Sequence, residues 1–391
     1  MSRLLVVKYG GSVLSDGSGI RKAAEQVKIE IEQGNRVVVV VSALKGVTDQ
    51  LIEATESINP HTPRFVQDHI IRLGEEQSTR LFTSALELMG VPSKEFTVDS
   101  PGWPIITDDV FGNAEPILEE CRRAVNLSIK PLLERGITPV VCGFVGRSLN
   151  GMVTTLGRGG TDTTATVLSR CLGADELVLV KDVGGVFSAD PYLVPASEKL
   201  DTISSMDAFL LSSGGAKVIH DKVFRYKNPG LNIRIISKGE GLSETGTVLN
   251  GEIPKLEILV SYEAIHMVSL VGGGASKSHV VKDTVDRIAS IGGVIHSVEA
   301  CENSLCVCFT HDALITLKTL HALIPRYGLK AISLKENLRL VTLQGRNIDQ
   351  VKARIPELLL DQQVHRVYAD SAKVILAVEQ AFVEELSSLF S

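Results

Sequence analysis

The chain lacks the features that mark several large classes of protein. Its 391 residues carry 40 Lys and Arg against 46 Asp and Glu, a formal net charge of −6, so no basic field is available for a nucleic acid. No apolar run approaches the ~20 residues that span a bilayer, and the first residues enter an apolar strand directly, without the layout of a signal peptide. We therefore expect a cytoplasmic protein that binds neither nucleic acid nor membranes.

Disulfide and metal frameworks are missing too. The six cysteines are Cys121, Cys142, Cys171, Cys301, Cys306 and Cys308. They form no Cys-x-x-Cys pair, and the nine histidines show no spacing typical of a zinc site. We expect the cysteines to be small buried side chains in a reducing compartment, and we predict no metal site made by protein side chains alone.

One glycine-rich segment carries most of the functional information. Residues 154–165 read TTLGRGGTDTTA and run into an apolar helical pattern. Glycines let backbone N–H groups approach a ligand, and a helix start adds free donors and a positive dipole end. Arg158 supplies a planar fork for a carboxylate or phosphate, and Asp162 a charge that can hold ammonium groups. The segment indicates an anion site, although a turn that caps a helix with Thr161 or Asp162 explains it as well.

A second glycine turn lies near the start of the chain. The apolar run Leu4–Val7 predicts a buried strand, residues 8–12 read KYGGS, and a helical pattern begins at Ile20. Strand, turn and helix place backbone donors around a phosphate, with Lys8 as a mobile cation. The pattern is not a P-loop, because no Gly-Lys-Ser/Thr follows at the required spacing. Together the two turns favour an anion-binding site over two structural turns.

Short apolar runs alternate with helical patterns over the first 250 residues. The alternation predicts a parallel or mixed sheet covered by helices on both faces, with its site beyond the carboxyl ends of the strands. The turns after Val7 and Val141 and the loop 181–190 fall at that edge. The expected strands are Leu4–Val7, Val37–Val41, Pro139–Val141, Leu177–Val180 and Ile233–Ile236, and the expected helices cover 20–32, 64–89, 113–135, 162–172 and 216–227.

The composition shifts around Thr247–Pro254, and we place a domain boundary at residue 250. Beyond it, two cycles of strand, helix and strands predict small α+β units at 251–330 and 331–391. The expected strands are 268–271, 294–298 and 305–309 in the first cycle and 338–343, 364–368 and 374–377 in the second, with helices at 280–291 and 348–360.

Six motifs in this order resemble those of aspartate kinases, within the wider amino acid kinase superfamily. They are KYGGS at 8–12, VSALKGVT at 41–48, GE at 74–75, TLGRGGTD at 155–162, KDVGGVFSADP at 181–191 and GAKVIH at 215–220. The tail is similar to the tandem ACT domains of that family, which bind small amino acids and dimerise. The resemblance implies an α/β amino acid kinase fold at 1–250, then ACT-like domains at 251–330 and 331–391, with 255–262 interleaving into the second.

The resemblance also implies a division of roles among the site residues. Phosphoryl transfer asks mainly for alignment and cations, and Lys8 and Lys217 are expected to flank the transferred group while Asp162 orients them. The residues expected to bind the acceptor are Ser42, Thr48, Glu75, Phe144, Arg158 and Thr161. Those expected to bind the nucleotide are Gly10, Gly11, Ser12, Lys181, Asp182, Phe187 and Lys217. A carboxylate acceptor is ionised at neutral pH, so no general base is needed.

Some of these assignments compete with simpler ones. Glu75 is followed by Glu76, and an acidic pair on a solvated helix face would give the same pattern. Phe144 suits a core as well as a pocket wall. On the nucleotide side, Tyr192 stands where the family has an arginine and Lys181 where it has a threonine, so the nucleotide contacts are expected to differ from the family pattern.

The motifs and the family resemblance together predict an ATP-dependent aspartate kinase that forms 4-phospho-L-aspartate, the first step of the aspartate-family amino acid pathway. The resemblance implies ATP with Mg²⁺ held chiefly through its phosphates, L-aspartate as acceptor, an amino-acid effector such as lysine or threonine on the tail, and a homodimer or higher homo-oligomer. Two alternatives stay open: a relative with a different acceptor, and a catalytically silent amino-acid sensor on the same scaffold. Lys8, Asp162 and Lys217 favour the enzyme, because a sensor has no need of them.

Overall fold

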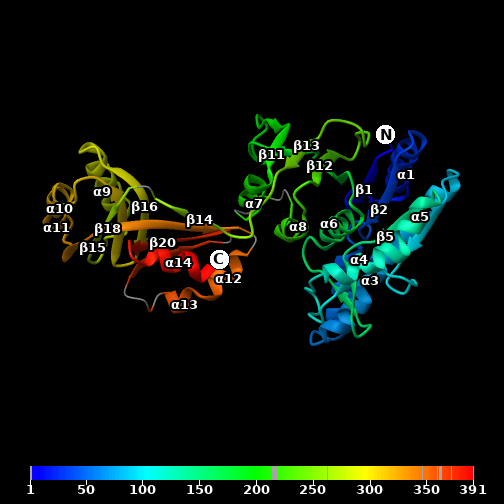
Figure 1. Cartoon of the computed structure of the whole chain (residues 1–391), viewed down its shortest axis with the longest axis horizontal. Helices are drawn as coiled ribbons and strands as arrows, with labels where there is room; N and C mark the ends of the chain where they lie inside the picture. Colours follow the sequence, from blue (N-terminus) through cyan, green and yellow to red (C-terminus); the bar gives the residue numbers. More distant parts are fainter. Residues whose placement is uncertain are drawn as a thin grey trace. The chain divides into compact units, whose positions relative to one another are not determined.

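The computed structural model describes residues 2–390 apart from 214–215, 217–218, 262, 346, 359, 361–362 and 371. The chain divides into two compact units, Met1–Ile253 and Pro254–Ser391, each with apolar clusters of its own (Figure 1). Among the described residues, no helix is both long enough and apolar enough to cross a membrane.

The first unit is built on a mostly parallel sheet with the strand order β11-β13-β12-β8-β1-β2-β5-β3. From β12 to β3 every neighbouring pair is parallel, which confirms the sheet expected from the alternating pattern. Its strands are β1 (Leu4–Tyr9), β2 (Arg36–Val41), β3 (Ser93–Phe96), β5 (Thr138–Cys142), β8 (Glu176–Lys181), β11 (Thr202–Ser204), β12 (Asn232–Ser237) and β13 (Thr247–Asn250). The central strands are buried on both faces, as their continuous apolar runs predict.

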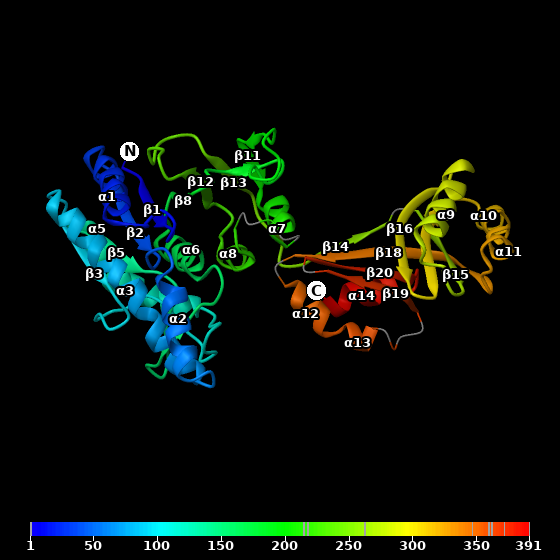
Figure 2. The same cartoon turned by 180° about the vertical axis from the view of Figure 1, so that it is seen from behind.

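Helices cover the two faces of this sheet. In Figures 1 and 2, α1 and α3 lie on one side of β1 and β2, and α6 lies on the other. Tyr9 packs against Phe82 on the α3 side, whereas Lys8, its neighbour along the strand, projects toward α6. The helices are α1 (Gly17–Glu32), α2 (Val47–Ile58), α3 (Arg64–Leu88), α4 (Leu118–Ser128), α5 (Lys130–Glu134), α6 (Gly160–Leu172), α7 (Ser205–Ser213) and α8 (Asp221–Tyr226).

Smaller strands support the loops at the carboxyl edge of the sheet. β4 (Ile106–Thr107), β6 (Val145–Ser148) and β7 (Val153–Thr155) form a sheet of their own, and β9 (Val186–Phe187) pairs with β10 (Lys199–Leu200). None of them was expected from the sequence, because they are short and lack an apolar alternation. β7 leads directly into the glycine-rich segment before α6.

In the second unit, the helix expected at 348–360 is instead two short helices, α12 (Ile348–Ala353) and α13 (Ile355–Leu358). Two of the helices expected in the first unit also differ from those observed. The pattern at 113–135 predicted one helix, but the residues before Leu118 are extended: Ala114 N–H donates to the carbonyl of Thr155 at 2.8 Å. A second helix, α5, then starts with Pro131 in its first turn, where proline, lacking an N–H, is tolerated. The helix expected at 216–227 begins only at Asp221, and two residues of this stretch, 217 and 218, lie outside the described part of the chain.

The second unit is a sheet in the order β16-β17-β15-β18-β20-β19, with β14 paired to β18. The long strand β18 serves two groups of elements, and Figure 2 shows it running between them. Its first half pairs with β15, and its second half with β20 and β14. The strands are β14 (Glu257–Val260), β15 (Ile265–Val271), β16 (Val294–Cys301), β17 (Ser304–Thr310), β18 (Ala331–Gln344), β19 (Val364–Ala369) and β20 (Lys373–Glu379).

Helices give this unit two separate apolar clusters, one beside each half of β18. They are α9 (Ser278–Ser290), α10 (Ala313–His321), α11 (Leu323–Tyr327), α12 (Ile348–Ala353), α13 (Ile355–Leu358) and α14 (Phe382–Phe390). The unit therefore has the α+β tandem character expected of the tail. One cysteine expectation was wrong: Cys301, at the end of β16, is exposed, whereas the other five are buried.

Candidate active site

The strongest polar contact at the carboxyl edge of the first sheet joins Lys8 to Asp162. Lys8 Nζ lies 2.7 Å from Asp162 Oδ1, and only about a tenth of either side chain is exposed. Lys181 Nζ, at the end of β8, lies 3.3 Å from the other carboxylate oxygen. Burial opposes ionisation of Asp162, but the two nearby ammonium groups outweigh it and hold the pKa of this carboxyl well below its usual range.

Helix α6 begins two residues earlier than a Thr161 cap would require and three earlier than an Asp162 cap would. Gly159, in the left-handed region with φ 70°, is the N-cap, and no side chain caps the helix. Glycine is needed there, since a Cβ would lie 2.2 Å from the Cβ of His220. Thr161 and Asp162 thus lie in the first turn, with their side chains available to the site.

A cavity of about 600 Å³ opens beside Lys8 and Asp162. All six residues expected to bind the acceptor line it: Ser42, Thr48, Glu75, Phe144, Arg158 and Thr161. Arg158 is exposed on the glycine-rich turn, while Ser42 Oγ donates to Thr161 Oγ1 at 3.0 Å. The structure therefore brings together, from four separate motifs, a cation, a buried acid and hydroxyl groups. We refer to this space as the acceptor cavity.

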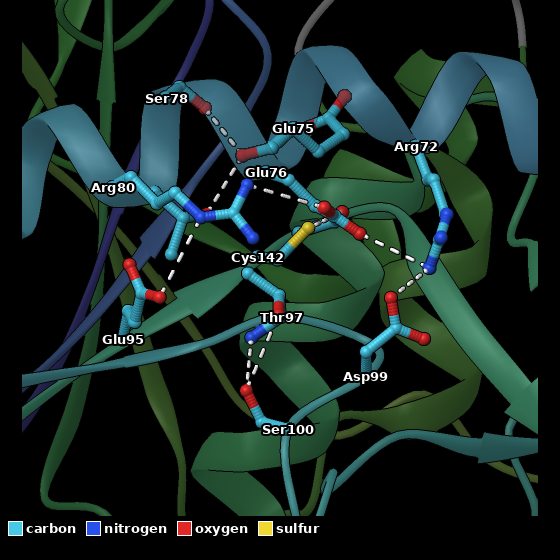
Figure 3. Close-up of polar contacts among 12 residues, drawn as sticks. Arg72, Glu75, Glu76, Ser78, Arg80, Glu95, Thr97, Asp99, Ser100 and Cys142 are labelled. Carbon is cyan, nitrogen blue, oxygen red and sulfur yellow. Dashed lines mark hydrogen bonds and ion pairs between the residues drawn. The ribbon is translucent and has the colours of Figure 1, made fainter.

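Glu75 and Glu76 are both buried, so the interpretation of a solvated acidic pair is wrong. Figure 3 shows Glu76 held between Arg72 and Arg80, at 3.3 and 3.4 Å. Glu75 belongs to the acceptor cavity instead, and among the described residues its Oε2 has no hydrogen-bond partner. Burial raises the pKa of Glu75 to about 8, against the smaller opposing effects of the Ala43 amide and Lys8. A cationic ligand group is the natural partner for this acid.

Phe144 is not a core residue of the strand end. Its backbone has φ 66°, which is rare for a bulky side chain and marks local strain. Its N–H donates to Thr164 Oγ1 at 3.1 Å, and its ring borders the acceptor cavity. The backbone of Phe144, with its positive φ, is thus hydrogen-bonded to a side chain in the first turns of α6.

Sequence reasoning missed several polar residues of the acceptor cavity, among them Lys45, Arg64 and Asp68. Asp68 accepts from Gly112 N–H at 2.9 Å, and from the N–H and hydroxyl of Thr155 at 3.1 and 2.7 Å. Burial, partly offset by these donors, raises its pKa. Asp68 thereby ties α3 to the strand that leads into the glycine-rich turn. Lys45 lies inside a quoted motif and could have been considered; Arg64 and Asp68 carry no motif signal.

A second cavity of about 820 Å³ lies on the other side of Lys8. Six of the residues expected to bind the nucleotide line it: Gly10, Gly11, Ser12, Lys181, Asp182 and Phe187. We call it the nucleotide cavity. Asp182 pairs with Lys238 at 3.0 Å, and Tyr192, which also borders the cavity, is largely exposed. Lys8, Gly11 and Ser12 line both cavities, so the two spaces meet at the first glycine turn.

Two further expectations concern Lys217 and metals. Lys217 lies outside the described residues. Within the residues that the structure describes, no group of three or more His, Cys, Asp or Glu side chains could hold a metal ion.

With this geometry in place, comparison with known proteins is informative. The model of the amino acid kinase family matches residues 3–237. The chain belongs to this family. The match covers the sheet, both glycine turns and both cavities of the first unit.

Relatives of this amino acid kinase include aspartokinases. The aspartokinase of Thermus thermophilus is 35% identical over 263 residues, 63% of this chain and 63% of the relative, so the chain matches less than two thirds of that protein's length. Aspartate kinase from Synechocystis aligns with a TM-score of 0.70 at 23% identity, over 99% of this chain and 69% of its own. Aspartokinase III of E. coli aligns with a TM-score of 0.57 at 22% identity, over nearly the full length of both chains. It has been solved with lysine and aspartate, and with aspartate and ADP. At these identities the solved structures show a shared fold.

Proposed function

We propose that this amino acid kinase is an ATP-dependent aspartate kinase, which transfers the γ-phosphoryl group of ATP to the side-chain carboxylate of L-aspartate. The observation that carries the proposal is the meeting of two chemically different cavities at Lys8. One offers groups suited to a carboxylate and an ammonium, and the other offers glycine-rich backbone and cations. A phosphoryl group that passes between them meets Lys8, which lines both cavities and pairs with Asp162.

Recognition of the acceptor follows from the charges that line its cavity. Arg158 can clamp a carboxylate through two parallel hydrogen bonds, and Glu75 is a buried acid without a partner on Oε2 among the described residues. An ammonium group beside Glu75 would favour its ionised form and so lower its raised pKa. Ser42, Thr48 and Thr161 add hydroxyl groups. This set suits an α-amino acid with a second carboxylate better than a simple carboxylic acid.

The transfer step needs alignment and positive charge rather than a base. The acceptor carboxylate is ionised at neutral pH, and one of its oxygens attacks the γ-phosphorus while the bond to the bridging oxygen of ADP breaks. Lys8 lies where the two cavities meet and is oriented by Asp162. By its motif, Lys217 is proposed as the second phosphate lysine.

The nucleotide side is proposed to use Gly10, Gly11 and Ser12 for phosphate contacts and Phe187 for packing against the base. Gly11 has no room for a side chain, since a Cβ would lie 2.6 Å from the carbonyl oxygen of Ala43. Magnesium commonly binds through one or two carboxylates and the substrate's phosphates. Asp182 and Asp190 are carboxylates in the lining of the nucleotide cavity, so the residues present fit an ion carried in with the nucleotide, whose charge neutralises the phosphates.

The second unit is proposed to form ACT-like domains at 251–330 and 331–391, to bind an amino-acid effector and to mediate homodimerisation. Its support is the pairing of both β14 and β20 with the second half of β18, which gives two α+β halves in one sheet. The structure of E. coli aspartokinase III with lysine offers a specific candidate ligand, lysine.

The test is ATP turnover with L-aspartate and Mg²⁺ in the presence of hydroxylamine, which traps an acyl phosphate as a hydroxamate. Aspartate-dependent hydroxamate is the expected result. Hydroxamate with another carboxylic acid alone would overturn the acceptor assignment. If no acceptor gave a product while an amino acid bound tightly, the chain would be an amino-acid sensor.

A further inference from the structure

Lys181 shares a face of the sheet with Lys8. The register of β1 against β8 pairs Lys8 with Leu179, and paired residues of neighbouring strands project from the same face. Lys181 lies two residues beyond Leu179, so its side chain emerges on that face again, one step closer to the carboxyl edge. The first turn of α6, which covers this face, places Asp162 between the two lysines.

The three charged groups form a compact cluster with a surplus of positive charge. Asp162 contacts Lys8 through Oδ1 at 2.7 Å and Lys181 through Oδ2 at 3.3 Å. The exposed fractions of the side chains are 10% for Lys8, 9% for Asp162 and 23% for Lys181. Within this trio one carboxylate faces two ammonium groups, so the formal charges of the three groups sum to +1. Burial, the larger effect, and the charge of Lys8 lower the pKa of Lys181, while Asp162 opposes them. An anion that enters here would relieve this cost.

The two lysines differ in the cavities that they line. Lys8 lines both cavities, Asp162 lines the acceptor cavity, and Lys181 lines the nucleotide cavity. Asp162 therefore lies on the acceptor side of the site, Lys181 lies on the nucleotide side, and Lys8 lies between the two cavities. A cation at the position of Lys181 lies on the side from which ADP departs.

We propose that Lys181 is a catalytic residue, a cation that contacts the β- and γ-phosphates and stabilises the negative charge of the leaving ADP. This rests on the proposed kinase function. In the step, the acceptor oxygen forms a bond to the γ-phosphorus, and the bond between that phosphorus and the bridging oxygen breaks. The electron pair remains on ADP, and no proton moves. Lys8 serves the transferred group and Lys181 the leaving group, with Asp162 aligning both.

The test compares Lys181→Met, which removes the charge at similar length, with Lys181→Arg, which keeps it. Calorimetry without any acceptor measures ADP and AMP binding, and the hydroxamate assay measures kcat and KM for ATP. For Lys181→Met we expect ADP binding about tenfold weaker with AMP binding unchanged, and kcat about a hundredfold lower. Lys181→Arg should recover most of both losses, because arginine keeps the positive charge. If Lys181 only positioned its neighbours, the planar guanidinium would not replace the amine, and no recovery would be seen.

Lys199→Met is the matched control. Lys199 lies on β10 beside the same loop and pairs with Glu240 at 3.8 Å, so neither readout should change by more than about twofold. A kcat for Lys181→Met within threefold of wild type, or equal losses of ADP and AMP affinity, would overturn the proposal. If the wild-type protein makes no hydroxamate with aspartate, the proposed function and the catalytic role of Lys181 both fail, and the comparison of ADP with AMP still shows whether Lys181 contacts the β-phosphate. Urea unfolding of each variant identifies losses caused by misfolding.

Discussion

Replacing Glu75 by glutamine is expected to flatten the pH dependence of stability of the first unit. Burial raises the pKa of Glu75 from its usual 4.5 to about 8 in the folded protein. Between these values the folded chain holds a proton that the unfolded chain has released. The stability associated with the neutral carboxyl is therefore fully present below pH 4.5 and is lost as the pH rises through 8.

The size of the effect follows from this shift. One pKa unit corresponds to about 1.4 kcal/mol, so Glu75 alone should lower the free energy of unfolding by about 1.4 kcal/mol for each pH unit within the window. Across the whole window the loss is about 5 kcal/mol. Glutamine has no proton to exchange. From pH 5 to pH 7.5 the variant should therefore gain about 3 kcal/mol relative to wild type.

The chain contains a convenient probe for this measurement. Trp103 is its single tryptophan and is buried in the first unit, with Nε1 donating to the carbonyl of Ile105 at 3.0 Å. Its fluorescence during urea unfolding at pH 5, 6, 7 and 8 reports on the unit that holds Glu75. Glu53→Gln, on the exposed surface of α2, is the same chemical replacement at a solvated position and should follow wild type at every pH. If Glu75→Gln also runs parallel to wild type within about 1 kcal/mol, Glu75 titrates normally and the argument from burial is wrong.

Four other outcomes follow from the same geometry. Binding of L-aspartate at pH 7 should release about 0.9 proton from wild type and none from Glu75→Gln, measured by calorimetry in buffers of different ionisation enthalpy; equal release would contradict an ammonium beside Glu75. Asp162→Ala should lower kcat about a hundredfold or more with little change in ATP affinity, and an unchanged kcat would count against its orienting role. Arg158→Ala should raise the KM for aspartate about 10- to 100-fold; wild-type saturation would exclude the carboxylate clamp. Arg234→Met should lower the free energy of unfolding by about 3 kcal/mol, because buried Glu176 loses the partner that binds it through Nε at 2.9 Å and Nη2 at 2.8 Å and keeps the more exposed Arg3; denaturant unfolding with no loss would refute this.

Much of the first unit could be predicted because its signals are local. Continuous apolar runs mark strands buried on both faces, and the glycines after Tyr9 and before Thr161 mark turns that admit a ligand. Parallel strands bring their carboxyl ends to one edge, so Lys8 and Lys181 could be expected near each other. The short strands of the loops and the extended residues before α4 could not, because their hydrogen bonds are made with distant segments such as Thr155.

The acidic pair on α3 shows the limit of local reasoning most clearly. Glu75 and Glu76 are adjacent and chemically alike, and no pattern in the sequence separates them. Glu76 pairs with Arg72 and Arg80, whereas Glu75 faces the acceptor cavity and has a raised pKa. The side from which other segments pack decides between these outcomes.

The sequence alone specifies the central strands of the first sheet, the two glycine turns, the family and the motif residues that line the two cavities, because buried strands and tight turns are encoded in short runs of residue types. Tertiary structure decides which charges meet and how strongly each is shifted. Strand register and the packing of α3 and α6 decide three features of the site. Lys8 and Lys181 pair with one carboxylate, Glu75 is buried, and Asp68 lines the acceptor cavity. Electrostatic energies depend on distance and on exclusion of water, and both arise only when remote segments come together.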